Sequence, residues 1–432
     1  MERAFRWLWL GQVLSNLGTQ CSLYGIGLWS FARQGQVVDF AAVAFVVQLS
    51  KVVVLPLLGR VLLRCPQRTV MLFANGVGAA CTVALALQLL WWQQVQLVAL
   101  LPFLALAAMA EAALVLSFGS LIPVLVSDPQ RRAGANGLFV TADGLVMSAA
   151  PFAGSALVAA AGLAGVLVVD GASFLIALLC VWTAWTPQLD ARLPWRAAQP
   201  SRLRFHQLWG HPSVRPLLVI TAVMAFVYAA TEVIFPAWVI AGPGRDRLGW
   251  ALLAGVSGFL LGQQLWQRWA WRRPSLALIS SLVVQSLILM GAGLVGFQNR
   301  LAFWYGGLMV FSLALPLALS ALQTRWQQLA AAALLPQVLA QRYRIEWASR
   351  LLAFAGVAML VDVVLRSALA WPHWPRWLIT ALGQGPGRPL AVALGAMGWL
   401  LFLGCCSQWQ RFLRESPSTA SAPAWIAADW LR

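Results

Sequence analysis

Six ionisable side chains lie inside long apolar stretches of this 432-residue chain. They are Lys51, which is the only lysine, and the acids Glu111, Asp143, Asp170, Glu232 and Asp362. A charge at the centre of a bilayer costs about 2.5–3.5 kcal/mol on insertion scales, so it is expected to be paired, to face water or to take part in transport. Ion pairing, proton binding and contact with a charged substrate are therefore the chemistry that these residues predict.

The composition identifies the surroundings of these charges as a membrane. Hydrophobic residues make up 61% of the chain and charged residues 10%, which is too apolar for a soluble domain of this length. The net charge of +17 does not indicate nucleic acid binding, because the arginines lie between apolar runs rather than on one face. We therefore expect a polytopic membrane protein with no nucleic acid partner.

Apolar windows of about 20 residues, enough to cross a ~30 Å hydrocarbon core, follow one another along the whole chain. They predict an all-α protein with twelve transmembrane helices, six in each half. The windows lie near residues 8–31, 40–62, 69–92, 95–118, 137–161, 164–185, 216–241, 249–267, 275–296, 299–322, 349–370 and 388–408.

The arginines predict the orientation, because short cytoplasmic loops retain positive residues. The 30 basic residues minus Lys51 leave 29 arginines, and 22 of them, Arg350 included, are assigned to the cytoplasmic side if the N-terminus is inside. Both termini are then cytoplasmic, and the first apolar run is interpreted as an uncleaved helix rather than a signal peptide. The expected location is the plasma membrane.

Four segments follow from these windows. We predict an N-terminal six-helix bundle at 1–185, a basic cytoplasmic linker at 186–215, a C-terminal six-helix bundle at 216–414 and a tail at 415–432. A second polar and basic stretch, 323–348, is expected to lie along the membrane surface.

Motifs for catalysis are absent from the sequence. It contains no GxxxxGK[ST] loop for ATP, no HExxH and no G-x-S-x-G, and its two linker histidines make a poor metal site. We expect neither an enzyme nor a resident cofactor or metal. A small-molecule substrate, protons and the lipid bilayer are the expected partners, and the protein is expected to be a monomer.

Several stretches resemble the major facilitator superfamily, and within it the branch that includes the enterobactin exporter and related secretion permeases. They are FRWLWLGQVLSNLG, LIPVLVSDPQRRAGANGL, GLAGVLVVDGASFLIALL, HPSVRPLL and GQGPGR. The resemblance implies two pseudo-symmetric six-helix bundles that rock about a central site in a bacterial inner membrane. It also implies that spans 1, 4, 7 and 10 line the cavity, while span 2 meets span 11 and span 5 meets span 8.

The chain departs from the family at three motifs. In the loop between spans 2 and 3, GRVLLRCPQR keeps Gly59, Arg64 and Arg68 but has Leu63 where the family usually has an aspartate. Close relatives often have an aspartate at Thr19. The antiporter motif of span 5 is reduced to two residues, Pro151 and Gly154. These losses leave room for a divergent or non-transporting member.

Span 1 has a polar stripe and a glycine face. The stripe residues Gln12, Ser15, Asn16 and Thr19 recur at three- and four-residue steps, whereas Gly11, Gly18 and Gly25 recur every seven. The glycine face is expected to pack against another helix. The stripe either lines the cavity, where it would contact substrate or protons, or bonds to neighbouring helices.

Glu111 in span 4 and Asp143 in span 5 are each expected ~10 Å from the cytoplasmic end of their span. Two neighbouring carboxylates raise each other's proton affinity, which suits a proton site in an exchanger. The alternative is that one or both pair with Arg131, Arg132 or a backbone group.

Lys51 and Asp362 are expected at similar depths in spans 2 and 11. An ion pair between them would close the outer gate. The alternative is that Asp362 pairs with Arg366, which leaves Lys51 to reach the interface or to bond Glu111.

Glu232, in the outer half of span 7, is the best candidate for contact with substrate or proton, because a lone acid facing lipid is too costly. Nearby Phe226, Tyr228 and Phe235 offer aromatic surface to an amphipathic or cationic substrate or simply pack. Asp170 is expected to be a structural hydrogen-bonding residue.

The sequence therefore predicts a secondary transporter, and specifically a proton-coupled exporter of a small amphipathic metabolite or drug. Two alternatives stay open: an uptake permease of the same fold, and a membrane assembly or scaffold protein that does not transport.

Overall fold

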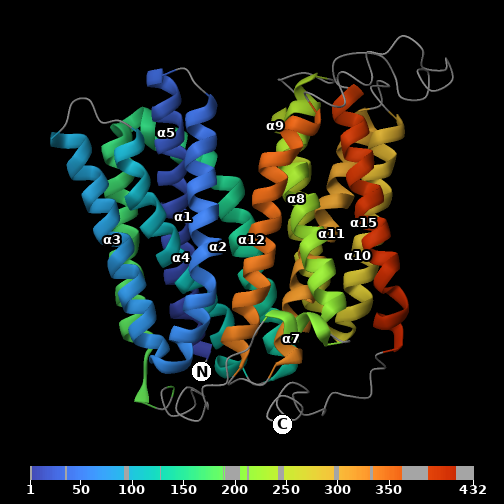
Figure 1. The fold of residues 1–432 in the computed structure, drawn as a ribbon, viewed down its shortest axis with the longest axis horizontal. Helices are drawn as coiled ribbons and strands as arrows, with labels where there is room; N and C mark the ends of the chain where they lie inside the picture. Colours follow the sequence, from blue (N-terminus) through green and yellow to red (C-terminus); the bar gives the residue numbers. More distant parts are fainter. Residues whose placement is uncertain are drawn as a thin grey trace. The chain divides into compact units, whose positions relative to one another are not determined.

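The computed structural model describes residues 2–34, 37–91, 97–126, 128–187, 189, 205–211, 214–241, 248–295, 301–330, 334–361 and 388–414. All regular secondary structure in these ranges is helical (Figure 1). The chain divides into two compact units. Within the described ranges, unit 1 comprises the residues of Met1–Phe205 and Trp326–Arg344, and unit 2 comprises those of His206–Arg325 and of the chain from Ile345 onward.

The described residues of unit 1 before Phe205 include the long helices α1 (Glu2–Gln34), α2 (Val37–Arg64), α3 (Gln67–Trp91), α4 (Leu97–Leu125) and α5 (Pro129–Ala184). α1 packs mainly on α5, α3 packs on α4 and α5, and α2 packs on α4. The side chains between them are largely leucine, valine and alanine, such as Leu100 and Leu104 of α4, which hold the helices together by van der Waals packing.

α5 contains the predicted spans 5 and 6 in one 56-residue element. Its turn is at Gly162, where φ is +66°, a left-handed conformation that a residue with a Cβ adopts only at a cost. Asp128 begins the helix, and its side chain accepts a hydrogen bond from the backbone N–H of Gln130. The break at Gly162 falls between the predicted windows 137–161 and 164–185.

Glycines let helices approach closely within each unit, as the sequence predicts. In α1, a Cβ on Gly11 would lie 2.8 Å from Cys180 Cβ of α5, and one on Gly18 would lie 2.7 Å from Asp170 Oδ1. In unit 2, a Cβ on Gly258 or Gly262 would meet the backbone of the helix that contains Met309 and Leu313. The packing role predicted for Gly11 and Gly18 is confirmed.

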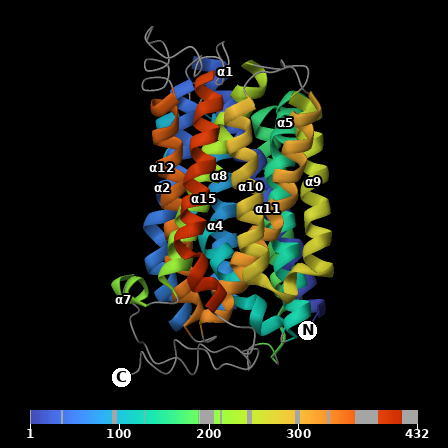
Figure 2. The same cartoon turned by 90° about the vertical axis from the view of Figure 1, so that its right-hand side faces the viewer.

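The described helices of unit 2 are α7 (Phe205–Gly210), α8 (Arg215–Ala241), α9 (Leu248–Arg268), the 3-10 turn η3 (Ala270–Arg272), α10 (Pro274–Val295), α11 (Leu301–Leu329), α12 (Leu335–Met359) and α15 (Arg388–Arg414). Three of them cross the boundary between the units: α7 begins one residue before it, the end of α11 belongs to unit 1, and so does the first part of α12. α15 packs against α10 and α8, and the three run side by side in Figure 2. Here too the helices are held by apolar side chains, among them Val227 and Leu278.

The stretch 323–348 does not lie along a surface as predicted. It forms the end of α11 and the first half of α12, and Trp326, Val338 and Leu339 are fully buried. The segment Trp326–Arg344 groups with unit 1, although the chain connects it on both sides to helices of unit 2. The prediction failed because polarity does not indicate exposure here: polar residues of the stretch, such as Gln327 and Arg342, are buried together with the apolar ones.

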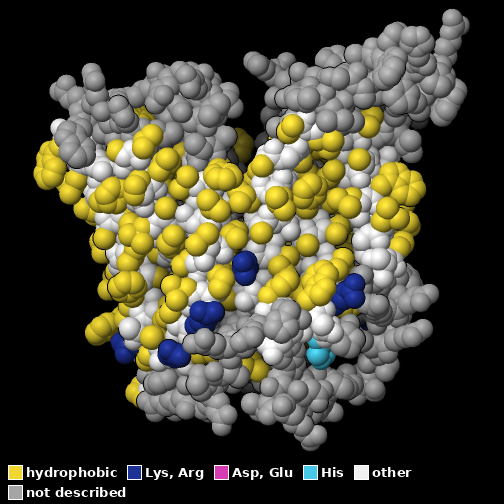
Figure 3. Space-filling model, in the orientation of Figure 1, with side chains coloured by type: hydrophobic (Ala, Val, Ile, Leu, Met, Phe, Trp, Pro, Cys, Tyr) yellow, Lys and Arg dark blue, Asp and Glu magenta, His cyan; other side chains and the backbone are white. Residues whose placement is uncertain are grey.

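Eight helices of the described residues are long and apolar enough to cross a membrane. Large apolar side chains are exposed along them, for example Val53, Phe73 and Leu179, where lipid would cover them. Figure 3 shows such side chains over the helices, with the visible Lys and Arg side chains in the lower half of the view, where the N-terminus lies in Figure 1. The protein is thus an all-α polytopic membrane protein, and the count of twelve spans stays a prediction.

Candidate functional site

A buried ion pair joins α2 and α4 in unit 1. Lys51 Nζ lies 2.7 Å from Glu111 Oε1, and the two side chains are only 9% and 14% exposed. The other carboxylate oxygen, Glu111 Oε2, is buried and has no hydrogen-bond partner among the described residues. The pair therefore neutralises both charges and leaves one oxygen unsatisfied.

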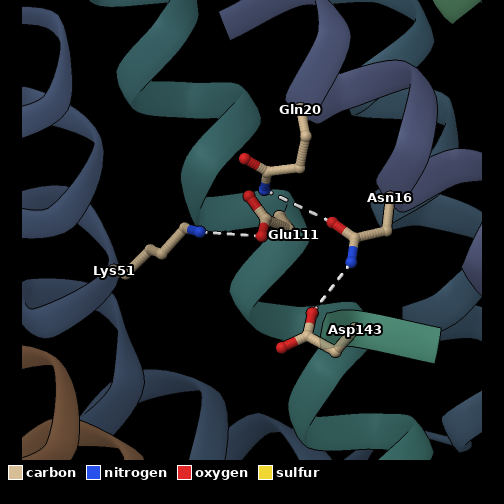
Figure 4. A network of polar contacts seen from close by, with 5 residues as sticks. All are labelled: Asn16, Gln20, Lys51, Glu111 and Asp143. Atoms are coloured by element: carbon tan, nitrogen blue, oxygen red, sulfur yellow. Dashed lines mark hydrogen bonds and ion pairs between the residues drawn. The ribbon is translucent and has the colours of Figure 1, made fainter. Parts of the chain in front are cut away.

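Two more helices bring polar side chains to the same region (Figure 4). Asn16 Nδ2 of α1 donates to Asp143 Oδ1 of α5 at 3.0 Å, and Gln20 Nε2 donates to Asn16 Oδ1 at 3.3 Å. The Asp143 carboxylate is exposed, whereas Asn16 and Gln20 are half-buried. Side chains from α1, α2, α4 and α5 thus point toward one another and form what we call the unit 1 polar site: Asn16, Gln20, Lys51, Glu111 and Asp143.

The structure does not bring the two predicted proton-binding acids into contact. Glu111 bonds to Lys51, and Asp143 bonds to Asn16. Of the loop arginines, Arg131 lies 3.6 Å from Asp128, and Arg132 donates to the Val126 carbonyl oxygen. The acids lie in one polar site but have different partners.

Lys51 pairs with Glu111, the partner that the sequence offered as an alternative. Asp362 and Arg366 are outside the described residues, so the predicted outer gate stays a prediction. Glu111 is available to Lys51 because α2 packs directly on α4.

The polar stripe of α1 divides into two rows. The first row contains Gln12, Asn16 and Gln20 at four-residue steps, and the sequence analysis did not include Gln20. Gln12 is half-buried and makes no side-chain hydrogen bond to the described residues. Thr19 belongs to the other row, because its hydroxyl donates to Asp170 Oδ1 at 3.4 Å. Thr19 is therefore not part of the unit 1 polar site; its bond to Asp170 is of the kind expected if the stripe bonds to neighbouring helices.

Asp170 links three helices of unit 1. Only 3% exposed, it accepts from Thr19 of α1, from Thr82 Oγ1 of α3 at 3.1 Å and from Ser173 of its own helix at 3.5 Å. A carboxylate buried among hydroxyl donors holds neighbouring helices in register. This geometry agrees with the structural role expected for Asp170.

The loop between spans 2 and 3 keeps its predicted motif residues at helix ends. A Cβ on Gly59 would lie 2.9 Å from Ala340 Cβ, so α2 passes close to the segment of α12 that groups with unit 1. Arg64 is exposed at the end of α2, and the Arg68 guanidinium lies 5.1 Å from the Trp182 ring centroid. Leu63, which replaces the usual aspartate, is buried with the apolar side chains.

The two predicted motif residues of span 5 lie within α5. Gly154 faces α1, because a Cβ there would lie 3.1 Å from the Cys21 carbonyl oxygen. Pro151 is in the same helix, and its side chain is outside the described set. Gly154 thus has a packing contact with the helix that supplies Asn16 and Gln20.

Unit 2 has an ion pair of its own. Arg350 Nη2 of α12 lies 2.7 Å from Glu232 Oε2 of α8, and the two side chains are 20% and 49% exposed. Next to Glu232 on α8, the buried Tyr228 hydroxyl donates to Gln285 Oε1 at 2.7 Å and its ring contacts Phe311 edge to face. Tyr228 thus has a structural bond, whereas the half-exposed Glu232 is open to solvent or ligand.

Sequence reasoning missed Arg350, because counting charges by loop assigned it to the cytoplasmic side. A signal was available: Arg342, Glu346 and Arg350 recur at four-residue steps, which places alternating charges on one face of a helix. A similar four-residue step from Asn16 would have identified Gln20.

Comparison with known proteins identifies the class. The family model of the Major Facilitator Superfamily matches residues 8–342, so the chain belongs to this superfamily of membrane transporters. No curated protein matches the sequence.

Three solved structures illustrate the shared fold. A bacterial homologue of the iron transporter ferroportin in an outward-facing state has a TM-score of 0.71 and 14% identity, over 94% of this chain and 100% of that chain. The human organic anion transporter MFSD10 (TETRAN) has a TM-score of 0.68 and 14% identity, over 94% of this chain and 99% of that chain. The proton:xylose symporter XylE has a TM-score of 0.68 and 11% identity, over 94% of this chain and 95% of that chain. Identities this low show the fold and not the substrate.

Proposed function

We propose that this transporter is a proton-coupled exporter of a small amphipathic metabolite or drug, working by alternating access as a monomer in a bacterial inner membrane with both termini in the cytoplasm. The unit 1 polar site is where the proton binds, and Glu232 of unit 2 contacts the substrate. The observation that carries the proposal is the buried pair of Lys51 and Glu111 with its unsatisfied carboxylate oxygen.

The coupling follows from the charges of this pair. With Glu111 ionised, Lys51 is neutralised at 2.7 Å and α2 is held to α4. A proton on Oε2 removes the negative charge, so Lys51 loses a charge-assisted bond in a buried site. A conformation that gives Lys51 a stronger acceptor or more water is then favoured, so protonation biases the equilibrium between conformations.

The remaining members of the site have distinct roles in this proposal. Asp143 is exposed and hydrogen-bonded by Asn16, so it gives the proton a path from solvent toward Glu111. Gln20 holds the Asn16 amide in place. Because Asn16 and Gln20 belong to α1, a change at the site is passed to a helix that the family uses to line its cavity.

A deletion strain gives the test. Cells that lack the protein should accumulate one or more small metabolites, or become sensitive to an amphipathic toxicant, and the wild-type gene should reverse the change. Glu111→Gln should fail to reverse it. The matched control is Glu415→Gln, beyond the last helix, which should complement fully. Complementation by Glu111→Gln equal to wild type would exclude the coupling role.

A second function has one observation in its favour. Leu63, buried in place of the usual loop aspartate, lacks the charge that relatives use at this motif, which suits a scaffold that no longer changes conformation. A deletion strain without altered metabolites or toxicant sensitivity would favour this function. Reversed accumulation, with less metabolite inside the deletion strain, would favour uptake instead.

A further inference from the structure

The acid of the unit 2 ion pair is half-exposed although it lies in a stretch that is apolar enough to cross a membrane. Glu232 lies within Arg215–Phe235, a stretch apolar enough to cross a membrane, and its side chain is 49% exposed. A carboxylate open to hydrocarbon is too costly, so this exposed surface must meet water or a polar ligand. Unlike the buried pair of Lys51 and Glu111, the pair of Glu232 and Arg350 is accessible.

The pair is held through one oxygen only. Arg350 Nη2 contacts Oε2 of Glu232 at 2.7 Å, and Oε1 makes no hydrogen bond to any described residue. A guanidinium and a carboxylate can form two parallel hydrogen bonds, but here only one is formed, so Oε1 of Glu232 can still accept a hydrogen bond from a cationic group. The Arg350 guanidinium also lies 5.6 Å from the Phe354 ring centroid, which offers apolar surface beside the charges.

The pair of Glu232 and Arg350 presents one charge of each sign to its surroundings. A ligand with a single charge would bind one member of the pair and would offer no opposite charge to the other. A zwitterion offers a group of opposite charge to each member, so the contact between the two side chains is replaced by two charge-assisted bonds to the ligand.

We propose that the pair of Glu232 and Arg350 is the binding site for a small zwitterion with an apolar body, its ammonium on Glu232, its carboxylate on Arg350 and its apolar part against Phe354. This assignment deepens the proposed function by naming the substrate class at Glu232, and it rests on that function. Without substrate, the two side chains neutralise each other. With substrate, each charge has a partner of opposite sign on the ligand, so all four charges stay paired.

Phenylalanine and two derivatives test the charge requirement. In a buffer at about pH 6, L-phenylalanine is a zwitterion, L-phenylalaninamide is a cation and N-acetyl-L-phenylalanine is an anion, and all three have the same ring. Equilibrium binding of tritiated phenylalanine to the full-length protein in detergent should be displaced by unlabelled phenylalanine about tenfold or more better than by either derivative, since each derivative lacks one charge-assisted bond.

Two single variants should change this preference in opposite directions. In Arg350→Gln the carboxylate of Glu232 remains, so the cationic amide should become the best ligand. In Glu232→Gln the guanidinium of Arg350 remains, so the N-acetyl anion should become the best ligand. Arg273→Gln, an exposed arginine of unit 2, should keep the wild-type order.

Several results would overturn the proposal. Wild-type protein that binds no phenylalanine, or that binds the amide or the N-acetyl derivative as well as the zwitterion, has no zwitterion site of this kind. Equal loss of all three ligands in both variants would show a structural role for the pair. If a variant does not fold, as judged by size-exclusion chromatography, the wild-type order of the three ligands still decides the question.

The result is independent of coupling. Binding in detergent needs neither a proton gradient nor the pair of Lys51 and Glu111, so failure here with normal complementation in cells would reject only the zwitterion. Zwitterion binding without any effect of Glu111→Gln in cells would reject only the proton coupling.

Discussion

Replacing Lys51 by methionine should destabilise unit 1 by leaving the buried Glu111 carboxylate without its cation. The side chains are 9% and 14% exposed and 2.7 Å apart, so solvent screens them little. Breaking a buried pair by removing one member costs on the order of 3–5 kcal/mol, and at ~2–4 °C per kcal/mol for a unit of about 200 residues the melting temperature should fall by roughly 6–20 °C. Glu111→Met should have a similar effect.

The double variant separates ion pairing from packing. With methionine at both positions no charge is left unpaired, and apolar replacement of a buried pair is often neutral. The melting temperature of the purified protein in detergent should therefore recover most of the loss, which gives a favourable interaction energy in the double-mutant cycle. Leu49→Met, at an exposed position of α2, serves as the control. A double variant whose loss equals the sum of the two single losses would refute this account of the pair.

Other substitutions test the packing and hydrogen bonds of each unit by thermal unfolding. Gly18→Ala should cost about 1–3 kcal/mol because its Cβ would overlap a buried carboxylate, whereas Gly76→Ala, with open space around it, should be neutral or slightly stabilising; equal stability of the two would contradict the close approach. Gln327→Leu removes buried bonds to α4 and α5 and should cost about 1–3 kcal/mol, while its exposed neighbour in Gln328→Leu should tolerate the change. Tyr228→Phe should cost about 1 kcal/mol or more through the lost 2.7 Å bond, and an unchanged melting temperature would show that the bond contributes nothing.

The sequence predicts the membrane class, the helices and the positions of the buried charges because these depend on local composition. A window of apolar residues around Glu111 or Glu232 identifies a charge within a membrane-spanning stretch whatever the tertiary structure is. The boundary at Gly162 is equally local, since a glycine between two apolar windows marks a turn. The family match then confirms the major facilitator superfamily, which the motifs resemble.

The partners of the charges could not be predicted as well, because they depend on helix rotation and on which helices meet. Lys51 had two acids within reach, and the packing of α2 on α4 brings Glu111 to it. Thr19 lies three residues from Asn16, yet a rotation of about 60° between them places Thr19 toward Asp170. Arg350 was assigned by counting loop charges, a rule that has no information about a charge paired inside a helix bundle.

Proton coupling through Glu111 is tested most directly in everted membrane vesicles. The vesicles come from the deletion strain, and the compound is the metabolite that accumulates in that strain. With wild-type protein, an acid interior should drive uptake of the compound, and nigericin, which collapses the pH gradient, should abolish it. Vesicles with Glu111→Gln at equal expression should show no gradient-driven uptake, and Glu415→Gln should behave as wild type. Gradient-driven uptake by Glu111→Gln at the wild-type rate would contradict the account.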